Sequence, residues 1–397
     1  MPGTRWLVAV ALAATALVSP IAVTPAHAAV ACGPRITAPL PDEPWPLRRL
    51  RPDLVWPIAD GSGVTVAVID SGSSRTHPAL EGQVLDGIDL VKPGQLGDCD
   101  EAGHGTTIAG IIAGKPTPDS AFHGIAPGAR ILPIRALQGT GDDQERDSLA
   151  PGRIASAVTM ATDRGADIIN LSLTTAPIPA LAAAVRYAQS KDVVVIAAVG
   201  NNPESEDLVP SYPASFPGVV GVAGVGPTGD YVPTSVQGNQ VDISAPGLLI
   251  AGPAPQGGGF LEFQAGGTSF ASAYVSGAMA LLRSARPDLS ANAAIRRLLN
   301  TADRPPDGWD NEVGNGVVNP TWAVNAIVDS DPGPQQLGRL TLSDPVSDPM
   351  AGTRTLAVLV TLGATMLSAL VLTATWVVRR GRRRRWRPGD VADYSAP

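Results

Sequence analysis

The sequence predicts an α/β fold, a mostly parallel central sheet with helices on both faces, followed by one membrane-spanning helix. Short β-branched runs alternate with helix-like segments that carry small residues on one side, as in parallel sheets. These runs have no long polar face, as expected of strands that are buried on both sides. Near the C-terminus, 23 consecutive residues carry no charge, which is long enough to cross a bilayer.

The chain begins with a predicted secretory signal peptide at residues 1–28. Arg5 precedes the apolar run 6–18, and Ala26-His27-Ala28 is a cleavage site of the small-x-small type. Residues 29–58 form an arm with seven prolines, which predicts an irregular, extended segment rather than a domain of its own.

The body of the chain, residues 59–329, carries the alternating elements. Its predicted strands are 64–69, 131–134, 167–173, 193–199 and 219–225. Its predicted helices are 105–113, 154–164, 178–190, 268–283 and 291–300. Residues 330–355 follow as a linker, since most of this segment is rich in Asp, Pro, Ser and Gln.

Residues 356–378 are the predicted transmembrane helix and residues 379–397 an arginine-rich cytoplasmic tail. The tail contains seven arginines, and such a cluster stays in the cytoplasm under the positive-inside rule. A buried core helix is the alternative for 356–378, but it does not explain the arginines. The body is therefore expected outside the cytoplasm, held at the cell membrane by a single span.

The net charge of −7 is unevenly divided. The first 28 residues carry +1 and the tail +5, which leaves −13 for the rest of the chain. An acidic body argues against binding to nucleic acid, which requires a basic face.

The two cysteines, Cys32 and Cys99, are an even number in an exported protein, which predicts a disulfide. Metal binding by the two thiols, or a lipid-modified Cys32, is the weaker alternative.

Four polar residues stand where parallel sheets place their sites. Asp70 ends the first strand, His104 lies in Gly-His-Gly-Thr before a helix, and Ser269 stands at the start of the helix 268–283. Asn201 follows the strand 193–199. Each also has a simple structural explanation, as a cap, a turn residue or a structural histidine.

Their combination favours chemistry over structure. The chain order Asp…His…Ser is one of the known orders of a catalytic triad. A helix N-terminus beside Ser269 and the amide of Asn201 could both stabilise an oxyanion. His123, which precedes a Gly-Ile-Ala-Pro turn, is expected to be structural.

At these residues the chain resembles the subtilisin-like serine proteases. Val-Ile-Asp-Ser-Gly, Gly-His-Gly-Thr, Gly-Asn and Gly-Thr-Ser-Phe-Ala-Ser match the signature blocks of that family, and the resemblance covers about residues 52–325. Ala273 departs from the pattern, since many subtilisins have proline there. The resemblance implies a subtilisin-like catalytic domain at 59–329 with an endopeptidase activity. It also implies a catalytic Asp70, His104 and Ser269, an oxyanion hole with Asn201, and substrate binding at Ser172, Leu173 and Thr174.

Within the family, the signal peptide, the proline-rich arm, Asp98-Cys99-Asp100 and the anchored C-terminus resemble the mycosins, the membrane-anchored proteases of type VII secretion systems. The resemblance implies cleavage of exported proteins or peptides, with secretion-system membrane proteins as partners. A structural cap of the complex, with proteolysis secondary, and a housekeeping surface protease are the alternatives.

No cofactor or metal is expected. The best acidic cluster, Asp142, Asp143 and Glu145, is interpreted as a solvated loop because it lacks the spacing of a calcium site. The arm is too small to fold alone, so we expect it to pack on the catalytic domain rather than to act as a cleavable inhibitory domain.

Overall fold

The computed structural model describes residues 32–139, 147–201, 210–306, 308–327 and 351–383. The described residues divide into two units, which lie within residues 1–329 and 330–397.

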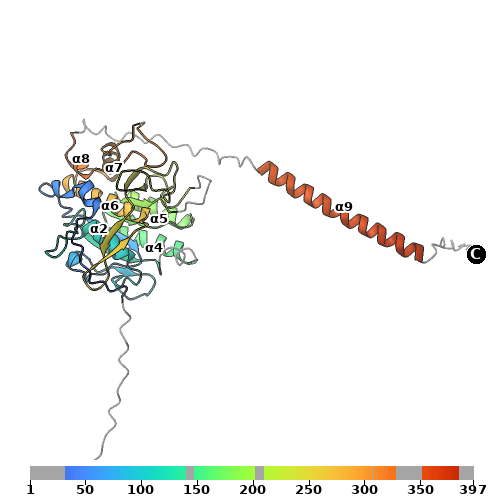
Figure 1. The fold of residues 1–397 in the computed structure, drawn as a ribbon, viewed down its shortest axis with the longest axis horizontal. Coiled ribbons are helices and arrows are strands. Elements are labelled where there is room, and N and C mark those ends of the chain that lie inside the picture. Colours follow the sequence, from blue (N-terminus) through green and yellow to red (C-terminus); the bar gives the residue numbers. More distant parts are fainter. Residues whose placement is uncertain (1–31, 140–146, 202–209, 307, 328–350, 384–397) are drawn as a thin grey trace, which may run out of the picture. The chain divides into compact units, whose positions relative to one another are not determined.

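The first unit is built around a central sheet covered by helices (Figure 1). The sheet has seven strands in the order β2-β3-β1-β4-β5-β6-β7. Every neighbouring pair in it is parallel. Its strands are β1 (Thr65–Asp70), β2 (Ile88–Asp89), β3 (Arg130–Arg135), β4 (Ile168–Leu171), β5 (Val194–Ala198), β6 (Val220–Val225) and β7 (Ile243–Pro246). A separate antiparallel pair consists of β8 (Ile250–Pro253) and β9 (Phe260–Phe263).

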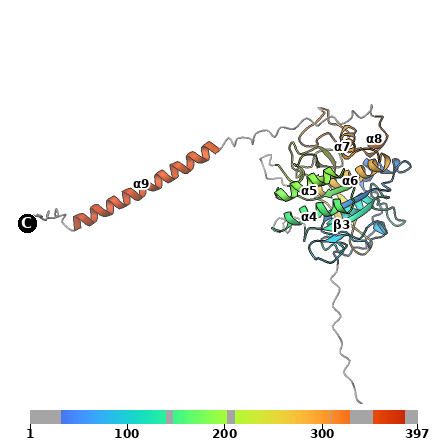
Figure 2. The same ribbon diagram turned by 180° about the vertical axis from the view of Figure 1, so that it is seen from behind.

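Two helical layers cover the sheet, as the sequence predicts. Val66 and Val68 of β1 belong to a core that contains α2 (His104–Ala113) and α6 (Thr268–Ala285). Their neighbours Ala67 and Ile69 belong to a second core, formed with α4 (Ala150–Asp163) and α5 (Pro179–Ser190). Figure 2 shows these two helices from the other side of the molecule. Since successive strand residues point to opposite faces, both faces are buried. Helices α7 (Ala291–Asn300) and α8 (Pro320–Asn325) also belong to the α6 side, and a 3₁₀ turn, η2 (Pro78–Leu80), follows β1.

The predicted elements are present with shifted ends. The five predicted strands end within two residues of β1, β3, β4, β5 and β6. Helix α4 begins at Ala150, four residues before the prediction, because Pro151 occupies its first turn, where its missing N–H costs nothing. Four strands were not predicted: β2, β7, β8 and β9 are short and contain glycine, proline or polar residues.

The expectation of an irregular, extended arm is wrong in part. The arm forms α1 (Trp45–Leu50) and a 3₁₀ turn, η1 (Pro52–Leu54). Pro44 precedes α1 and Pro46 lies in its first turn, so neither removes a helical hydrogen bond. Leu47 and Leu50 are buried in the α2–α6 core.

The start of the arm packs on the body through its backbone. Ile36 N–H donates to the Gln256 carbonyl over 3.0 Å, and Gly259 N–H donates to the Ile36 carbonyl over 2.9 Å. Ala121 N–H donates to the Leu40 carbonyl over 3.0 Å. A disulfide joins Cys32 to Cys99, the pair that the sequence predicts. The arm is therefore part of the packed body.

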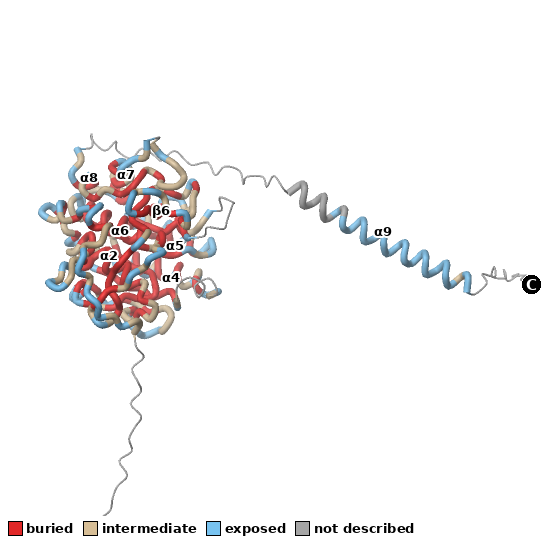
Figure 3. Tube along the Cα trace, in the orientation of Figure 1, coloured by how far each residue is buried: buried red, intermediate tan, exposed pale blue. Residues whose placement is uncertain are grey.

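The second unit contains α9 (Ala351–Arg383). Its segment Thr361–Arg383 contains an 18-residue stretch with a mean hydropathy of 1.7 and is long and apolar enough to cross a membrane. The side chains of residues 361–380 are exposed (Figure 3), as suits a helix surrounded by lipid.

Candidate active site

Asp70 lies at the carboxyl end of β1, in the middle of the sheet. Its side chain is fully buried, and its Oδ1 accepts hydrogen bonds from Ser71 N–H over 2.7 Å and from His104 Nδ1 over 2.8 Å. The second contact assigns the proton to Nδ1, which leaves Nε2 of a neutral imidazole as the proton acceptor.

Gly105 allows this contact. A Cβ atom at Gly105 would lie 2.0 Å from the Gly72 carbonyl oxygen and 3.1 Å from Asp70 Cβ. Only glycine lets the first turn of α2 approach the end of β1 so closely. The close approach brings His104, the first residue of α2, within reach of Asp70.

The His104 imidazole is 13% exposed and packs against Phe270 of α6, with ring centroids 5.5 Å apart. Burial lowers the pKa of His104, but the carboxylates of Asp70 and Asp100 outweigh burial and hold the pKa above its ordinary value. The surroundings therefore favour the imidazolium, the form that a general base adopts once it has taken a proton.

Ser269 lies in the first turn of α6, next to Phe270. Its Oγ donates to the Ser172 carbonyl over 3.0 Å, and Ser172 Oγ donates to the Ser269 carbonyl over 2.8 Å. Ser172 Oγ also contacts Asn170 Oδ1 and Ser272 Oγ. This buried polar cluster fixes the start of α6 against the end of β4.

Asn201 follows β5 and faces the same helix start. Its Oδ1 accepts the Thr268 N–H over 2.8 Å, which fixes the amide and leaves Nδ2 to donate elsewhere. A Cβ atom at Gly267, whose φ is 150°, would lie 3.1 Å from that Nδ2. The amide thus lies beside the residue pair that precedes Ser269.

The segment predicted to bind substrate lies beside Ser269. The side chains of Ser172 and Leu173 are buried, whereas Thr174 is exposed. A Cβ atom at Gly200 would lie 3.0 Å from Thr174 Cγ2. The Ser172 side chain belongs to the buried cluster, so Thr174 is the residue of this segment with an exposed side chain.

The sequence did not single out Asp100 as a site residue. Its fully buried carboxylate contacts Ser71, Gly103 and Thr106, the residues that surround Asp70 and His104. Burial raises the pKa of Asp100, and the hydrogen bonds from Thr106 oppose that shift. The triplet Asp98-Cys99-Asp100 is visible in the sequence, but these contacts arise only in the fold.

The other two described histidines, His77 and His123, contact backbone groups. His77 Nδ1 accepts from Ala79 N–H and its Nε2 contacts the Gly259 carbonyl, and burial lowers its pKa. His123 Nδ1 contacts the Gly124 carbonyl, and its ring packs edge-on against Trp56.

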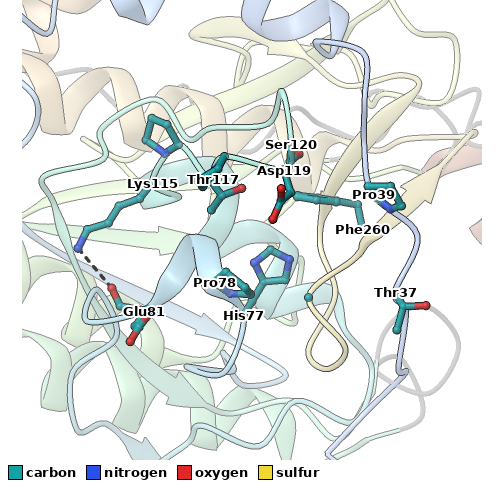
Figure 4. Close-up of a pocket in the computed structure, with 13 residues that line it drawn as sticks. Thr37, Pro39, His77, Pro78, Glu81, Lys115, Thr117, Asp119, Ser120 and Phe260 are labelled. Atoms are coloured by element: carbon teal, nitrogen blue, oxygen red, sulfur yellow. Dashed lines mark hydrogen bonds between the residues drawn. The ribbon is translucent and has the colours of Figure 1, made fainter.

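His77 also lines a groove of about 700 Å³ between the arm, η2 and the loop that follows α2 (Figure 4). In that groove Lys115 Nζ donates to the Glu81 carbonyl over 3.3 Å. None of Asp70, His104 or Ser269 lines it.

In the described part of the chain, no three His, Cys, Asp or Glu side chains gather in a way that could hold a metal ion. Asp142, Asp143 and Glu145 lie outside the described residues.

Comparisons with known proteins agree on one family. Residues 61–316 match the subtilase family. Mycosin-3 of Mycobacterium tuberculosis is 34% identical over 386 residues, an alignment that covers 83% of this chain and 82% of mycosin-3. The solved structure of the MycP3 protease from the type VII (ESX-3) secretion system has a TM-score of 0.65 and 34% identity, over 73% of this chain and 91% of that chain. A chain in the structure of an intact ESX-5 inner membrane complex has a TM-score of 0.64 and 29% identity, over 87% of this chain and 98% of that chain.

Proposed function

We propose a function from the premise that the chain belongs to the subtilase family and is a subtilisin-like serine endopeptidase related to the mycosins. In this proposal the protein cleaves exported proteins at the outer face of the cell membrane, as a component of a type VII secretion system. The main support for the enzymatic part of this proposal is the contact of 2.8 Å between His104 Nδ1 and the buried Asp70 Oδ1. It lies beside the start of the helix that bears Ser269.

In the proposed acylation step, Ser269 Oγ attacks the scissile carbonyl carbon while His104 Nε2 takes the hydroxyl proton. The hydroxyl must first turn away from the Ser172 carbonyl, its hydrogen-bond partner in this structure. Asp70 holds the imidazole tautomer and stabilises the imidazolium. The C–N bond then breaks as His104 gives the proton to the leaving amine, which leaves an ester on Ser269.

In the proposed deacylation step, water attacks the ester carbonyl carbon while His104 takes a proton from the water. The bond between that carbon and Ser269 Oγ then breaks, His104 returns the proton to Ser269 Oγ, and the acid product leaves. In both steps the oxyanion accepts hydrogen bonds from Asn201 Nδ2 and the Ser269 backbone N–H. The contact of Asn201 Oδ1 with Thr268 N–H supports this role, because it fixes the orientation of the amide. Losing one such donor typically costs about 2.7–4 kcal/mol of activation free energy.

The substrate is proposed to bind as an extended strand along Ser172, Leu173 and Thr174, with main-chain hydrogen bonds to their backbone. The two hydrogen bonds between Ser172 and Ser269 support this position of the substrate, because they hold the segment beside the nucleophile.

We further propose that residues 1–28 direct export, that α9 anchors the protein, and that the tail 379–397 remains in the cytoplasm. The apolar segment Thr361–Arg383 and the arginines at its end support this orientation.

Secretion-system membrane proteins are the proposed partners. The similarity to nearly the whole of a chain in the ESX-5 inner membrane complex supports such an association. It equally favours a second candidate function, in which the domain is mainly a structural cap of the complex and proteolysis is secondary.

Labelling with a fluorophosphonate tests the enzymatic proposal. The full chain in detergent, compared with Ser269→Ala, is expected to gain one adduct by intact mass only when Ser269 is present. Absence of the adduct in folded wild-type protein contradicts the proposed mechanism. Secretion measured with the same variant in the native host separates the two functions: a loss of secretion supports essential proteolysis, whereas normal secretion with an intact complex supports the cap.

A further inference from the structure

Asp100 holds the first turn of α2 from outside the helix. Helix α2 begins at His104 after Gly103, whose φ is 81° and which has no side chain to cap the helix. Asp100 supplies the missing acceptor: its Oδ1 accepts Gly103 N–H over 2.8 Å and its Oδ2 accepts Thr106 N–H over 2.7 Å. Thr106 Oγ1 adds a contact of 2.6 Å to Oδ2. The two N–H groups lie on either side of His104.

The same carboxylate reaches the residue that follows Asp70. Ser71 Oγ lies 2.8 Å from Asp100 Oδ1 and 3.1 Å from Asp70 Oδ1. A hydroxyl has one proton, and the shorter contact assigns it to Asp100. Ser71 Oγ in turn accepts Gly105 N–H over 3.2 Å.

Asp70, Ser71, Asp100 and Thr106 are all at most 1% exposed, so water does not compete for these contacts. Burial raises the pKa of Asp100, but the N–H groups that donate to both of its oxygens favour the ionised form. Buried charge acts on its neighbours with little screening.

We propose that Asp100 is a positioning residue of this protease, a second buried carboxylate that fixes the start of α2 to the end of β1 and so holds His104 against Asp70 as the imidazolium forms. The effect of Asp100 on catalysis rests on the proposed function. Its effect on the His104 imidazole can be tested without catalysis. Asp70 contacts His104 directly, whereas Asp100 acts through Ser71, Gly103 and Thr106.

Asp100→Asn is the decisive variant, because it keeps the volume but removes the charge. An Asn side chain has one acceptor oxygen, so its NH₂ group would face either Gly103 N–H or Thr106 N–H. We expect Asp100→Asn to lose one of the hydrogen bonds to the first turn of α2 and to stabilise the His104 imidazolium less.

The first measurement is an NMR titration of the His104 imidazole in the full chain, labelled at histidine and held in nanodiscs. The sequence has only four histidines, and His104→Gln identifies the signal. Asp70 and Asp100 are the charged groups that raise the pKa of His104. We expect Asp100→Asn to lower that pKa by about half a unit or more. The matched control is Asp242→Asn, a carboxylate that accepts Gly221 N–H at the β6–β7 edge and is expected to leave the His104 pKa unchanged.

The second measurement is the rate of fluorophosphonate labelling. Asp100→Asn is expected to label about tenfold more slowly, per folded molecule, than the wild type and Asp242→Asn. Wild-type protein that is not labelled would refute the proposed function, yet the titration would still test Asp100.

A His104 pKa in folded Asp100→Asn equal to that of the wild type overturns the proposal, even if labelling is slower. Should Asp100→Asn not fold, Thr106→Val replaces it, since it removes one donor to Asp100 and nearly preserves volume. We expect a smaller shift in the same direction, and no shift overturns the proposal.

Discussion

At the scale of single residues, the contribution of Asp242 to the free energy of unfolding depends on pH. It lies immediately before β7, where its Oδ2 accepts Gly221 N–H over 2.8 Å. Burial raises the pKa of this carboxyl group to about 6, and the hydrogen bond from Gly221 only partly opposes the shift. The folded protein therefore holds the Asp242 proton more tightly than the unfolded chain does.

The sign of the pH effect follows from this difference. Asp242 favours folding fully below pH about 4, where both states are protonated, and this contribution is lost as the pH rises through about 6. Asp242→Asn can still accept Gly221 N–H but never ionises. We expect it to raise the free energy of unfolding at pH 7 by at most about 3 kcal/mol, with the gain vanishing near pH 4. Thermal unfolding of both proteins across this range checks it, and a gain that is equal at pH 4 and pH 7 would contradict it.

The positions of Asp70 and His104 at a strand end and a helix start, and of Ser269 at another helix start, could be predicted from the sequence, whereas their catalytic assignment depended on their combination and on the family resemblance. Each stands at a strand end or helix start with glycines nearby, and Gly105 shows why: the glycine allows the close approach that the site needs. The role of Asp100 could not be identified, because its partners include Ser71, on another segment of the chain. That contact depends on how α2 docks against β1, which no local pattern encodes.

At the scale of elements, a leucine substitution in α1 tests whether this helix of the arm contributes to the core. Leu47 of α1 is 1% exposed, whereas Leu54 of the neighbouring η1 is 52% exposed. We expect Leu47→Ala to lower the free energy of unfolding by about 2–5 kcal/mol, because it leaves a cavity. The matched control Leu54→Ala is expected to change it by less than about 0.5 kcal/mol. Chemical denaturation of the two variants measures both, and equal effects would mean that the arm does not contribute to the core.

The strands that the sequence predicted each contain at least two valine or isoleucine residues, whereas the strands that it missed contain at most one. Strand β5 is five small apolar residues, Val194–Ala198, buried on both faces. Strand β8, Ile250–Pro253, contains glycine and proline, and its contacts with β9 and α2 are what make it a strand. In α1 the prolines predicted an interruption, but their position in the first turn turned out to be compatible with a helix.

At the scale of the whole molecule, the distribution of charge and apolar residues predicts two compartments. The acidic body and the arginine-rich tail are separated by one uncharged segment, residues 356–378. The negative body and the positive tail are expected on opposite sides of the membrane, because arginine clusters resist translocation.

Reporter fusions test this orientation. Alkaline phosphatase folds into its active form only outside the cytoplasm, because it needs its disulfides. We therefore expect high phosphatase activity when the enzyme replaces everything after residue 340, and very low activity when it is fused after residue 397. The same two fusions are then made with all seven tail arginines replaced by glutamine, to show whether charge sets the orientation. In these variants we expect the fusion after residue 397 to gain phosphatase activity, because the barrier to translocation is weaker. Equal phosphatase activity of the two fusions in the unaltered chain would contradict a single span. High activity only for the fusion after residue 397 would place the protease in the cytoplasm, where the Cys32–Cys99 disulfide would not persist.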